Sequence, residues 1–546
     1  MEAHYHVHHS DTEDEEETKR DEPQNEGTDF ETAVSLTGFG KFNYFLLLIC
    51  LVGTIGHQCD ITSLSFLLPS AECDLQLSPM DKGYLTAVMF VGSMFGSFLW
   101  GFLSDAFGRH VLLLVIYLLD SIVNIIASFS QTFWMLLVFK FLAGFLICGP
   151  QAMTKAYLSE FHDEKHRARL VLWTGLYASS GNLLVPAVAW AVIPQPWSWK
   201  IFDLITYNSW RVYMLIVTLP TLIACILLFF SCETPKFLMA AGKDDQALQV
   251  LRKMYSVNTG KDPDTYPVKF LTTRKISRVL APDLSHKSVF SVIRRGFCRM
   301  KPLFKTPLLP RALLIFTLNF GAIYGVNTLK QWLPQLFATI EEYDHLQVEL
   351  NITSSRGVSL CEMVDFVAAQ DDTAQLRQSG TGHCSVAMME NSVYIRTLIT
   401  AVVSMLGFLA AGLIVNLLGK KTMATSTYFL GGVCGIAIYW SRSSELTLAL
   451  ASLFIALCSV AQIAVLSITV EYFPTTLRNI AISLGLILGQ TGAMVGNITF
   501  PALLSINCTI PFILMGSCAL GCSALSTLLP KTKNRRNSVA LKNTVT

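Results

Sequence analysis

His57 and Asp60 are ionisable residues in a stretch of the chain that is otherwise mostly apolar. Helical positions three apart share one face, so this spacing predicts an imidazole beside a carboxylate. Such a pair can exchange protons near neutral pH and can attract a cation. Within lipid, an ionisable side chain must line a cavity or find a partner. Two interpretations follow: a site for proton coupling or for recognition of a cationic solute, and a buried structural pair.

Other charged residues also fall within apolar stretches. Lys330 either contributes to such a site or extends its long side chain toward the nearer membrane surface. Asp120, with Asn124 one turn further on, either serves a site or satisfies a neighbouring helix.

The composition places these residues in a membrane. The chain has 546 residues, of which 52% are hydrophobic and 15% charged, and its mean hydropathy is +0.47. Soluble domains carry about 25% charged residues, and roughly 20 apolar residues cross a bilayer as a helix. We therefore predict an all-α membrane protein with twelve transmembrane helices, at about 42–64, 84–104, 111–130, 133–157, 169–193, 211–232, 312–338, 394–416, 422–441, 446–470, 479–499 and 508–529.

These spans form two groups of six, which we predict to be separate bundles. The boundaries are an acidic disordered tail at 1–41, an N-terminal bundle at 42–232, a basic linker at 233–311, a C-terminal bundle at 312–529 and a tail at 530–546. Because the linker is rich in Lys and Arg, the positive-inside rule puts it and both termini in the cytoplasm. Spans on either side of it argue against a nucleic-acid-binding patch.

The opposite face carries the longer segment 339–393, which is outside the cell or in a vesicle lumen. It contains the sequon at Asn351 and the cysteines Cys361 and Cys384. Glycosylation of Asn351 and a disulfide between the two cysteines are chemically permitted on that side. Asn497 and Asn507 also head sequons, but they lie close to the membrane.

Two short segments of the chain repeat each other at one offset. "GFLSDAFGRH" at 101–110 corresponds to "GLIVNLLGKK" at 412–421, 311 residues later, and the same offset recurs between the spans that follow. Two homologous six-helix halves are typical of transporters that rock about a midplane site. The repeated residues that we assign to a gating motif are Gly101, Asp105, Gly108, Arg109, Glu160 and Arg167 in the first half, and Gly412, Asn416, Gly419, Lys420, Glu471 and Arg478 in the second.

The repeated residues suggest how the cytoplasmic side is held shut. Gly101 and Gly412 would let a neighbouring helix approach closely, and Asp105 would face a helix N-terminus of the other half. Arg109 and Arg167 would pair with Glu160 or Asp105, and we expect these contacts to break when the cytoplasmic side opens. The alternative is that these charges only set the topology.

The pattern Gly-x-x-x-Asp-x-x-Gly-Arg at 101–109 resembles the loop motif of the major facilitator superfamily. "LPSAECDLQLSPMDKGYL" (68–85), "AWAVIPQPWSW" (189–199) and "SWRVY" (209–213) resemble the synaptic vesicle glycoprotein 2 family more narrowly. The resemblance implies the major facilitator fold. It also implies that Trp190 and Trp332 line a central cavity, where a flat aromatic wall suits an organic solute or cation. Both could instead be interfacial anchors, and Lys140 stands where many superfamily members carry an Arg linked to proton coupling.

The predicted function is a transporter of a small organic solute by alternating access, with protons as a candidate coupling ion. The alternatives are a non-transporting vesicle protein, with vesicle-protein partners bound through its cytoplasmic tail, and a glycosylated surface receptor. An enzyme is the least expected class, because the sequence has no P-loop and no nucleophile–base signature. We expect no cofactor and no metal, although His4, His6, His8 and His9 cluster in the tail. The membrane is that of a synaptic or secretory vesicle, or the plasma membrane.

Overall fold

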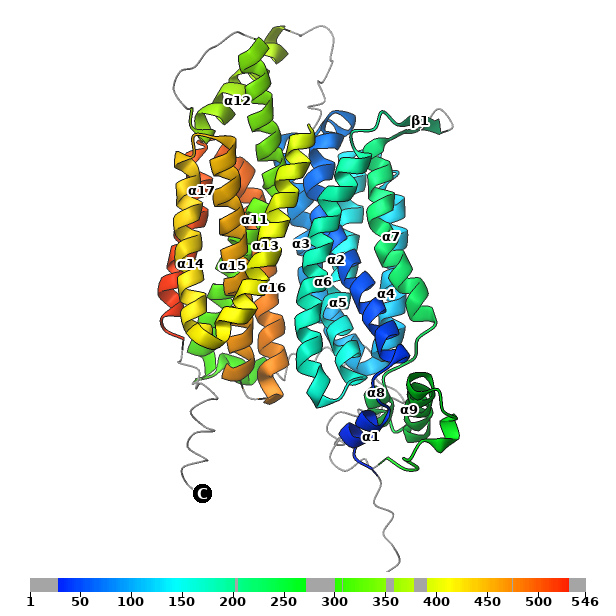
Figure 1. The fold of residues 1–546 in the computed structure, drawn as a ribbon. Helices are drawn as coiled ribbons and strands as arrows, with labels where there is room; N and C mark the ends of the chain where they lie inside the picture. Colours follow the sequence, from blue (N-terminus) through cyan, green and yellow to red (C-terminus); the bar gives the residue numbers. More distant parts are fainter. Residues whose placement is uncertain are drawn as a thin grey trace, which may run out of the picture.

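The computed structural model describes residues 28–201, 205–271, 300–306, 308–349, 358–377, 390–473 and 475–529, and these residues are almost entirely helical. Two bundles of long helices stand side by side (Figure 1), which confirms the predicted all-α, twelve-helix architecture. The N-terminal half contains α2 (Lys41–Leu75), α3 (Pro79–Phe107), α4 (Arg109–Ala127), α5 (Phe133–Glu160), α6 (Glu164–Val192) and α7 (Ser209–Phe229). The C-terminal half contains α11 (Leu308–Glu349), α13 (Asn391–Leu418), α14 (Lys420–Ala437), α15 (Ser444–Tyr472), α16 (Thr475–Leu504) and α17 (Thr509–Ser526).

Ten of these helices, within the described residues, are long and apolar enough to cross a membrane. The other two, α6 and α14, hold the predicted spans 169–193 and 422–441. They are more polar, because α6 contains "TGLYASSGN" within its predicted span and α14 begins with "KKT".

Several helices are longer than the apolar pattern predicts, α2 and α11 most of all. α2 continues through most of the expected connection at 65–83, and α11 continues into the segment 339–393. Hydropathy marks where a helix leaves lipid, and it does not mark where the helical backbone ends.

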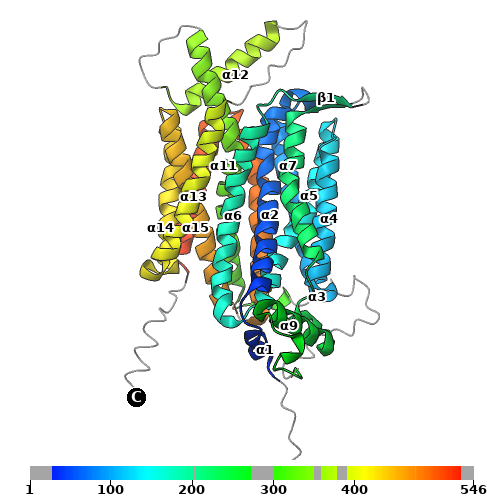
Figure 2. The same ribbon diagram turned by 45° about the vertical axis from the view of Figure 1, so that its right-hand side comes forward.

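The two ends of the bundle differ, and we call them the α9 face and the α12 face (Figure 2). The α9 face carries α1 (Phe30–Leu36), α8 (Pro235–Ala240), α9 (Asp244–Thr259) and the 3-10 turns Pro263–Thr265 and Lys301–Phe304. The α12 face carries α12 (Leu360–Arg377), the 3-10 turn Ile438–Trp440 and an antiparallel hairpin of β1 (Ser198–Ile201) and β2 (Ile205–Asn208).

The predicted disordered tail 1–41 is wrong for its last part. α1 is helical and packed, with Phe30, Ala33 and Val34 buried. The Tyr266 hydroxyl donates to the Ala33 carbonyl at 2.6 Å. These apolar side chains give α1 a face that the acidic composition of the tail as a whole conceals.

The helix starts repeat at the predicted offset. α14, α15 and α16 begin 311 residues after α4, α5 and α6. Thr132 caps α5 by accepting from the amide of Met135, and Ser443 caps α15 by accepting from the amide of Leu446. A side-chain oxygen at this position satisfies an otherwise unpaired N–H, so both copies begin this helix in the same way.

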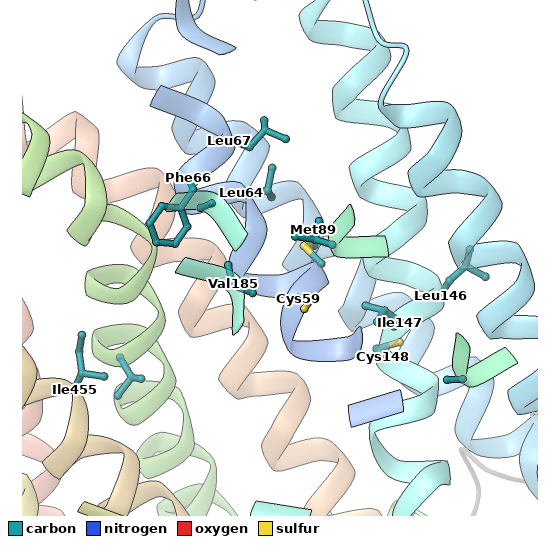
Figure 3. Packing of buried hydrophobic residues seen from close by; sticks show 14 of the residues in the cluster. Cys59, Leu64, Phe66, Leu67, Met89, Leu146, Ile147, Cys148, Val185 and Ile455 are labelled. Carbon is teal, nitrogen blue, oxygen red and sulfur yellow. The ribbon is translucent and has the colours of Figure 1, made fainter. Parts of the chain in front are cut away.

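The core of the N-terminal half lies where α2 crosses its neighbours. Figure 3 shows Cys59, Leu64 and Leu67 of α2 near Met89 of α3 and Ile147 of α5, all of them buried. These contacts fix the rotation of α2, and therefore the direction in which its polar residues point.

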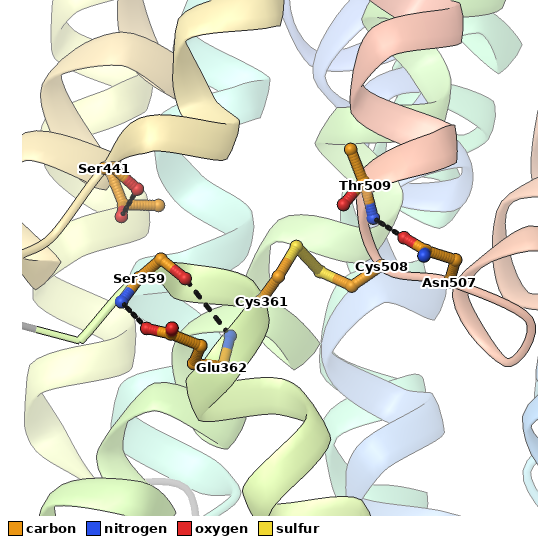
Figure 4. Close-up of a disulfide and its surroundings, with 8 residues drawn as sticks. Ser359, Cys361, Glu362, Ser441, Asn507, Cys508 and Thr509 are labelled. Carbon is orange, nitrogen blue, oxygen red and sulfur yellow. Dashed lines mark hydrogen bonds between the residues drawn. A yellow bond between two sulfur atoms is a disulfide. The ribbon is translucent and has the colours of Figure 1, made fainter.

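A disulfide joins Cys361 of α12 to Cys508, at the turn between α16 and α17 (Figure 4). The predicted pairing of Cys361 with Cys384 is therefore wrong. Spacing within one segment suggested Cys384, whereas the fold brings the distant Cys508 to α12. Cys384 and the predicted glycosylation site Asn351 lie outside the described residues.

Candidate functional site

The two halves meet in the middle of the bundle and at the α12 face. All five hydrogen bonds described between them lie there. They are Lys82 to Gln335 (3.2 Å), Trp190 to Asn391 (2.8 Å), Gln331 to the Ile61 carbonyl (2.7 Å), Thr491 to Met94 (3.6 Å) and Lys330 to Asn182. Near the α9 face, Gly101 and Gly412 are exposed, with open space where a side chain would begin. The described contacts therefore close the α12 side.

Asp60 lies in a buried polar cluster inside the N-terminal half. Its carboxyl group is within hydrogen-bonding reach of Asp120 and Asn124 of α4, and Lys140 of α5 is close enough to interact with its charge. Lys140 donates to the Asn124 side-chain oxygen at 3.1 Å. Asp60, Asp120 and Lys140 are at most 3% exposed. α2, α4 and α5 thus bring together two acids and one base away from water.

The charges of this cluster balance only when a proton is bound. One ammonium group neutralises one of the two carboxylates, and a contact between two carboxyl groups needs a proton on one of them. Oδ2 of Asp60 and Oδ2 of Asp120 are buried and receive no hydrogen bond from a described donor. A shared proton would supply that donor.

His57 does not join Asp60 as the spacing predicts. Its Nδ1 faces the Ile147 carbonyl of α5 at 3.2 Å, and no described contact joins it to the Asp60 carboxyl group. Its Nε2 is buried without a described partner. The two side chains leave α2 in different directions, since one meets the α5 backbone and the other meets α4.

Lys330 faces the N-terminal half, so the alternative of a side chain extended to the membrane surface is wrong. It donates to the Asn182 side-chain oxygen of α6, which also accepts from Gln58 of α2 at 3.1 Å. α11 extends well beyond this residue, and that is why Lys330 is not near a helix end.

The two predicted cavity tryptophans lie toward the α12 face. Trp190 is 41% exposed and donates to the Asn391 side chain of α13. Trp332 is 6% exposed, packs on Phe500 with ring centroids 5.4 Å apart, and lines a small pocket with Ser65, Lys82 and Gln335. Trp190 thus helps to close the α12 side, whereas Trp332 borders a narrow space between the halves.

The first copy of the repeated motif is a capped turn between α3 and α4. Gly108 has φ +93°, a backbone conformation that favours glycine. Arg109 forms an ion pair with Glu160 at 3.2 Å. The Glu233 carboxylate accepts from the backbone amides of Arg109 (3.1 Å) and His110. An acid at these free amides stabilises the start of α4.

The second copy repeats this geometry. Gly419 has φ +77° between α13 and α14, and Lys420 forms an ion pair with Glu471. The pairs Arg109–Glu160 and Lys420–Glu471 are equivalent at the offset of 311, and each stays within its own half.

This arrangement corrects two expectations about the gate. A Cβ added at Gly101 or Gly412 would meet nothing within 4 Å, so no close helix approach requires a glycine there in this conformation. The Arg109–Glu160 pair is intact although no described hydrogen bond joins the halves at the α9 face. The pair therefore braces one half, and opening does not have to break it.

The remaining motif residues have other neighbours. Arg167 bonds Glu31 of α1 at 3.0 Å and the carbonyls of Ser159 and His162. Nε of Arg478 is buried and has no partner among the described residues. The side chains of Asp105 and Asn416 lie outside the described part of the chain.

His162 adds a buried histidine at the α9 face, outside the spans. It faces the Leu158 carbonyl through Nδ1 at 2.7 Å and the Asn43 amide through Nε2 at 2.9 Å. Burial lowers the pKa of His162. A neutral ring that donates from Nδ1 and accepts at Nε2 fits both contacts.

The sequence interpretation missed two groups. Arg211 is 1% exposed and pairs with Asp74 at 2.8 Å, which ties α7 to the end of α2. Lys155 lies within a predicted span, and the rule that singled out Asp60 would also have found it. Arg211 and Asp74 carried no such signal, because they lie at span ends, where charges are common.

A known protein family matches most of the chain. Residues 5–344 match the model of the family described as "Sugar (and other) transporter". The chain therefore belongs to this family of major facilitator transporters.

Its curated relatives include synaptic vesicle glycoproteins. Synaptic vesicle glycoprotein 2C of Mus musculus is 22% identical over 93% of this chain and 81% of its own length. Synaptic vesicle glycoprotein 2B of Homo sapiens is 23% identical over 93% of this chain and 86% of its own length. The chain thus resembles these proteins over most of its length.

Solved structures of a bacterial transporter share the fold. The xylose transporter XylE from E. coli, in a partially occluded inward-open conformation, superposes with a TM-score of 0.62 at 16% identity, covering 90% of this chain and 99% of that one. The same proton:xylose symporter bound to 6-bromo-6-deoxy-D-glucose gives a TM-score of 0.60 at 16% identity, covering 90% of this chain and 97% of the other. At this identity the likeness concerns the fold.

Proposed function

We propose that this chain moves a small organic solute across a membrane by alternating access, and that proton binding at the Asp60–Asp120–Lys140 cluster drives this movement. The buried cluster carries the proposal. Two carboxyl groups opposed by one ammonium form a proton-binding site in the interior of one half. Because burying an unbalanced charge is costly, gain or loss of the proton changes the packing that α2, α4 and α5 prefer.

The contacts between the halves support the alternating-access part of the proposal. Described hydrogen bonds close the α12 side, and the glycines near the α9 face border open space. Rocking of the halves would exchange these arrangements. The braced turns at Gly108 and Gly419 would keep each half rigid while it moves.

The proposal extends to orientation and location. The basic linker and both termini would lie in the cytoplasm, and the α12 face would lie in a vesicle lumen or outside the cell. The names of the curated relatives favour a vesicle membrane. They also support the second candidate function, a vesicle-membrane protein that uses this fold as a binding partner without transport.

Uptake into liposomes containing the purified full-length chain tests the proposal. An inward proton gradient should increase the uptake of at least one member of a sugar and organic-solute panel. Asp60→Asn should abolish that increase, whereas the matched control Asp245→Asn, on the exposed surface of α9, should preserve it. A gradient-driven rate that Asp60→Asn leaves unchanged would refute proton coupling, and no uptake of any solute would favour the binding-partner function.

A further inference from the structure

Asn124 lies between the base and one acid of the polar cluster. Its side-chain oxygen accepts from the Lys140 ammonium at 3.1 Å. Its side-chain nitrogen donates to the Asp120 carboxyl group at 3.4 Å and to the Asp120 carbonyl at 3.2 Å. Because an ammonium group only donates, the amide must turn its oxygen to Lys140 and its nitrogen to Asp120. We call this arrangement the amide bridge between α5 and α4.

Lys140 is held by a neutral group and not by a carboxylate. Among the described residues it forms no ion pair, and the Asn124 oxygen is its hydrogen-bond acceptor. The buried Arg211 of the same half behaves differently, since it pairs directly with Asp74 at 2.8 Å. The amide bridge therefore keeps the base of the cluster one side chain away from its acid.

The packing of α2 on α4 places Asp60 at the level of the amide bridge. A Cβ added at Gly53 of α2 would collide with the Tyr117 hydroxyl of α4, so the two helices touch there. Both helices begin at the α9 face. Asp60 and Asn124 each lie about two turns beyond this contact, on the same face of their helices. The second acid thus faces the bridge from α2.

Other titratable groups on α2, α4, α5 and α7 have partners of their own. Tyr117 bonds Thr154, Cys148 the Phe145 carbonyl, His57 the Ile147 carbonyl, Cys225 the Leu114 carbonyl, and Arg211 both Asp74 and the Ser130 carbonyl. The thiols and the phenol are neutral at pH 7. The two acids and the base of the cluster are therefore the charged groups that face Asn124.

We propose that Asn124 is the positioning residue of the proton site, which holds Lys140 away from Asp120 and thereby keeps a proton on the acids. The inference rests on the proposed function, because it names what regulates the site that drives transport. An ammonium group in direct contact with a carboxylate favours the ionised form, and separation weakens this effect. A base held by the bridge balances the charge of the cluster without displacing its proton.

Two substitutions of nearly equal size test this role in opposite directions. Asn124→Leu removes the bridge and lets Lys140 pair directly with an acid, so the cluster should hold its proton less tightly. Asn124→Asp binds Lys140 itself and leaves Asp60 and Asp120 without a base, so the cluster should hold its proton more tightly. A merely structural role would damage both variants alike and would not move proton binding in opposite directions.

Infrared titration of the purified full-length chain measures the proton without transport. The signal is the carbonyl band of protonated carboxyl groups. Asp60→Asn should remove the contribution of the cluster, because one acid and one base balance without a proton. The midpoint of that contribution should fall by about 1–3 pH units in Asn124→Leu and rise by a similar amount in Asn124→Asp.

Two further variants serve as controls. Asn124→Gln keeps the amide, and its midpoint should lie closer to that of the natural chain than either of the other two. Ser121→Ala should leave the midpoint unchanged, because the buried Ser121 hydroxyl donates to the Tyr117 carbonyl of its own helix at 2.8 Å. Midpoints of Asn124→Leu and Asn124→Asp that do not move in opposite directions overturn the inference.

Uptake into liposomes separates this inference from the proposed function. Opposite infrared shifts, followed by the pH profile of gradient-driven uptake, support both. Opposite shifts without uptake of any solute support the positioning role and contradict transport. Gradient-driven uptake without opposite shifts supports the proposed function and overturns the role of Asn124. If Asp60→Asn removes no part of the carboxyl band, both are overturned.

Discussion

The two halves share their surface turns and differ in their interiors. At the offset of 311, Arg109 and Glu160 correspond to Lys420 and Glu471, and both ion pairs are present. Inside the bundles, Asp120, Asn124 and Lys140 correspond to Gly431, Gly435 and Ala451. In place of the polar cluster, the C-terminal half packs Phe454 against Gly435 and Cys458 against Gly431.

This difference separates the turns, which both halves share, from the buried cluster of two acids and a base, which has no counterpart at the equivalent positions of α14 and α15. The turns at the α9 face shape each half, so both copies keep them. Under the proposed function one proton site is enough, and the second copy has only small residues at the equivalent positions. The buried acids and their base thus lie in the N-terminal half, and Lys330 of the C-terminal half donates to Asn182 across the interface.

Among these variants, removing the cation of the polar cluster should cause the largest loss of stability. Lys140→Met leaves two buried acids without their base, and we expect a loss of roughly 3–5 kcal/mol in the free energy of unfolding. Adding Asp60→Asn should restore much of the lost stability, because it removes one of the two buried carboxyl groups. Thermal unfolding of the single and double variants measures this, and equal melting temperatures for the two would show that charge balance is not the cause.

Placing the same cation in the other half tests the comparison in reverse. Ala451 is 1% exposed. The positions equivalent to Asp120 and Asn124 are glycines, so they offer no side chain to pair with a lysine at 451. Ala451→Lys should cost about 3 kcal/mol and lower the yield of monodisperse protein. Ala451→Met is the control for side-chain size. If the Lys variant is as stable as the Met variant, the interior of the C-terminal half is more polar than described.

The stability cost of replacing a turn glycine with alanine should depend on how close its neighbours lie. At Gly108 an added Cβ would lie 2.3 Å from the Glu233 carboxylate, whereas at Gly419 it would meet nothing within 4 Å. Both have positive φ, so alanine at either costs about 1–2 kcal/mol, and Gly108→Ala should cost more. Gly101→Ala, in open space with ordinary helical backbone, should be nearly neutral. Melting temperatures in this order would confirm that strain is common to both turns and that the Glu233 contact belongs to the first.

The two equivalent ion pairs should differ in strength. Side chains of the Arg109–Glu160 pair are 18% and 9% exposed, and those of the Lys420–Glu471 pair are 29% and 47% exposed. Exposed pairs contribute about 0–1 kcal/mol. Glu160→Gln should therefore lower stability more than Glu471→Gln, and high salt should affect only the second pair appreciably. A larger loss for Glu471→Gln would reverse this ranking.

The smallest effect concerns pH at the α9 face. His162 has Phe473 as its equivalent 311 residues later, so this sensitivity belongs to one half. Because its pKa is lowered in the folded chain, stability should be full above the ordinary imidazole pKa of about 6.5. It should fall as the pH drops from there toward the lowered value. Melting temperature against pH, compared with His162→Gln, would show a weaker acid loss in the variant.

The sequence predicted most of the architecture and less of the site. Apolar stretches located all twelve helices, because lipid leaves few alternatives for a backbone. The offset of 311 located the equivalent turns, and it identified Lys420 and Glu471 as the counterparts of Arg109 and Glu160. The ion pair between Lys420 and Glu471 was found only in the structure. The helical spacing of His57 and Asp60 wrongly predicted a contact between their side chains. Residues on one helix face can still point toward different neighbouring helices.

Long-range pairings were beyond the sequence pattern. Cys361 could not be matched to Cys508, 147 residues away, without the fold. The contact between Lys330 and Asn182 could not be predicted either. It depends on how the helices of the two halves are placed against each other. The assignment of Gly101 and Gly412 to a close approach depended on a conformation that this structure does not adopt.

The Cys361–Cys508 disulfide lies wholly within the C-terminal half and fastens α12 to the turn that leads into α17. In the proposed rocking motion, α12 should therefore move with that half as one body. A fluorophore or an antibody fragment attached to α12 would then serve as a pointer for the motion, read against a second label on the β1–β2 hairpin. Reduction of this disulfide should broaden the distribution of distances between the two labels, and it should leave the proposed rocking motion unchanged.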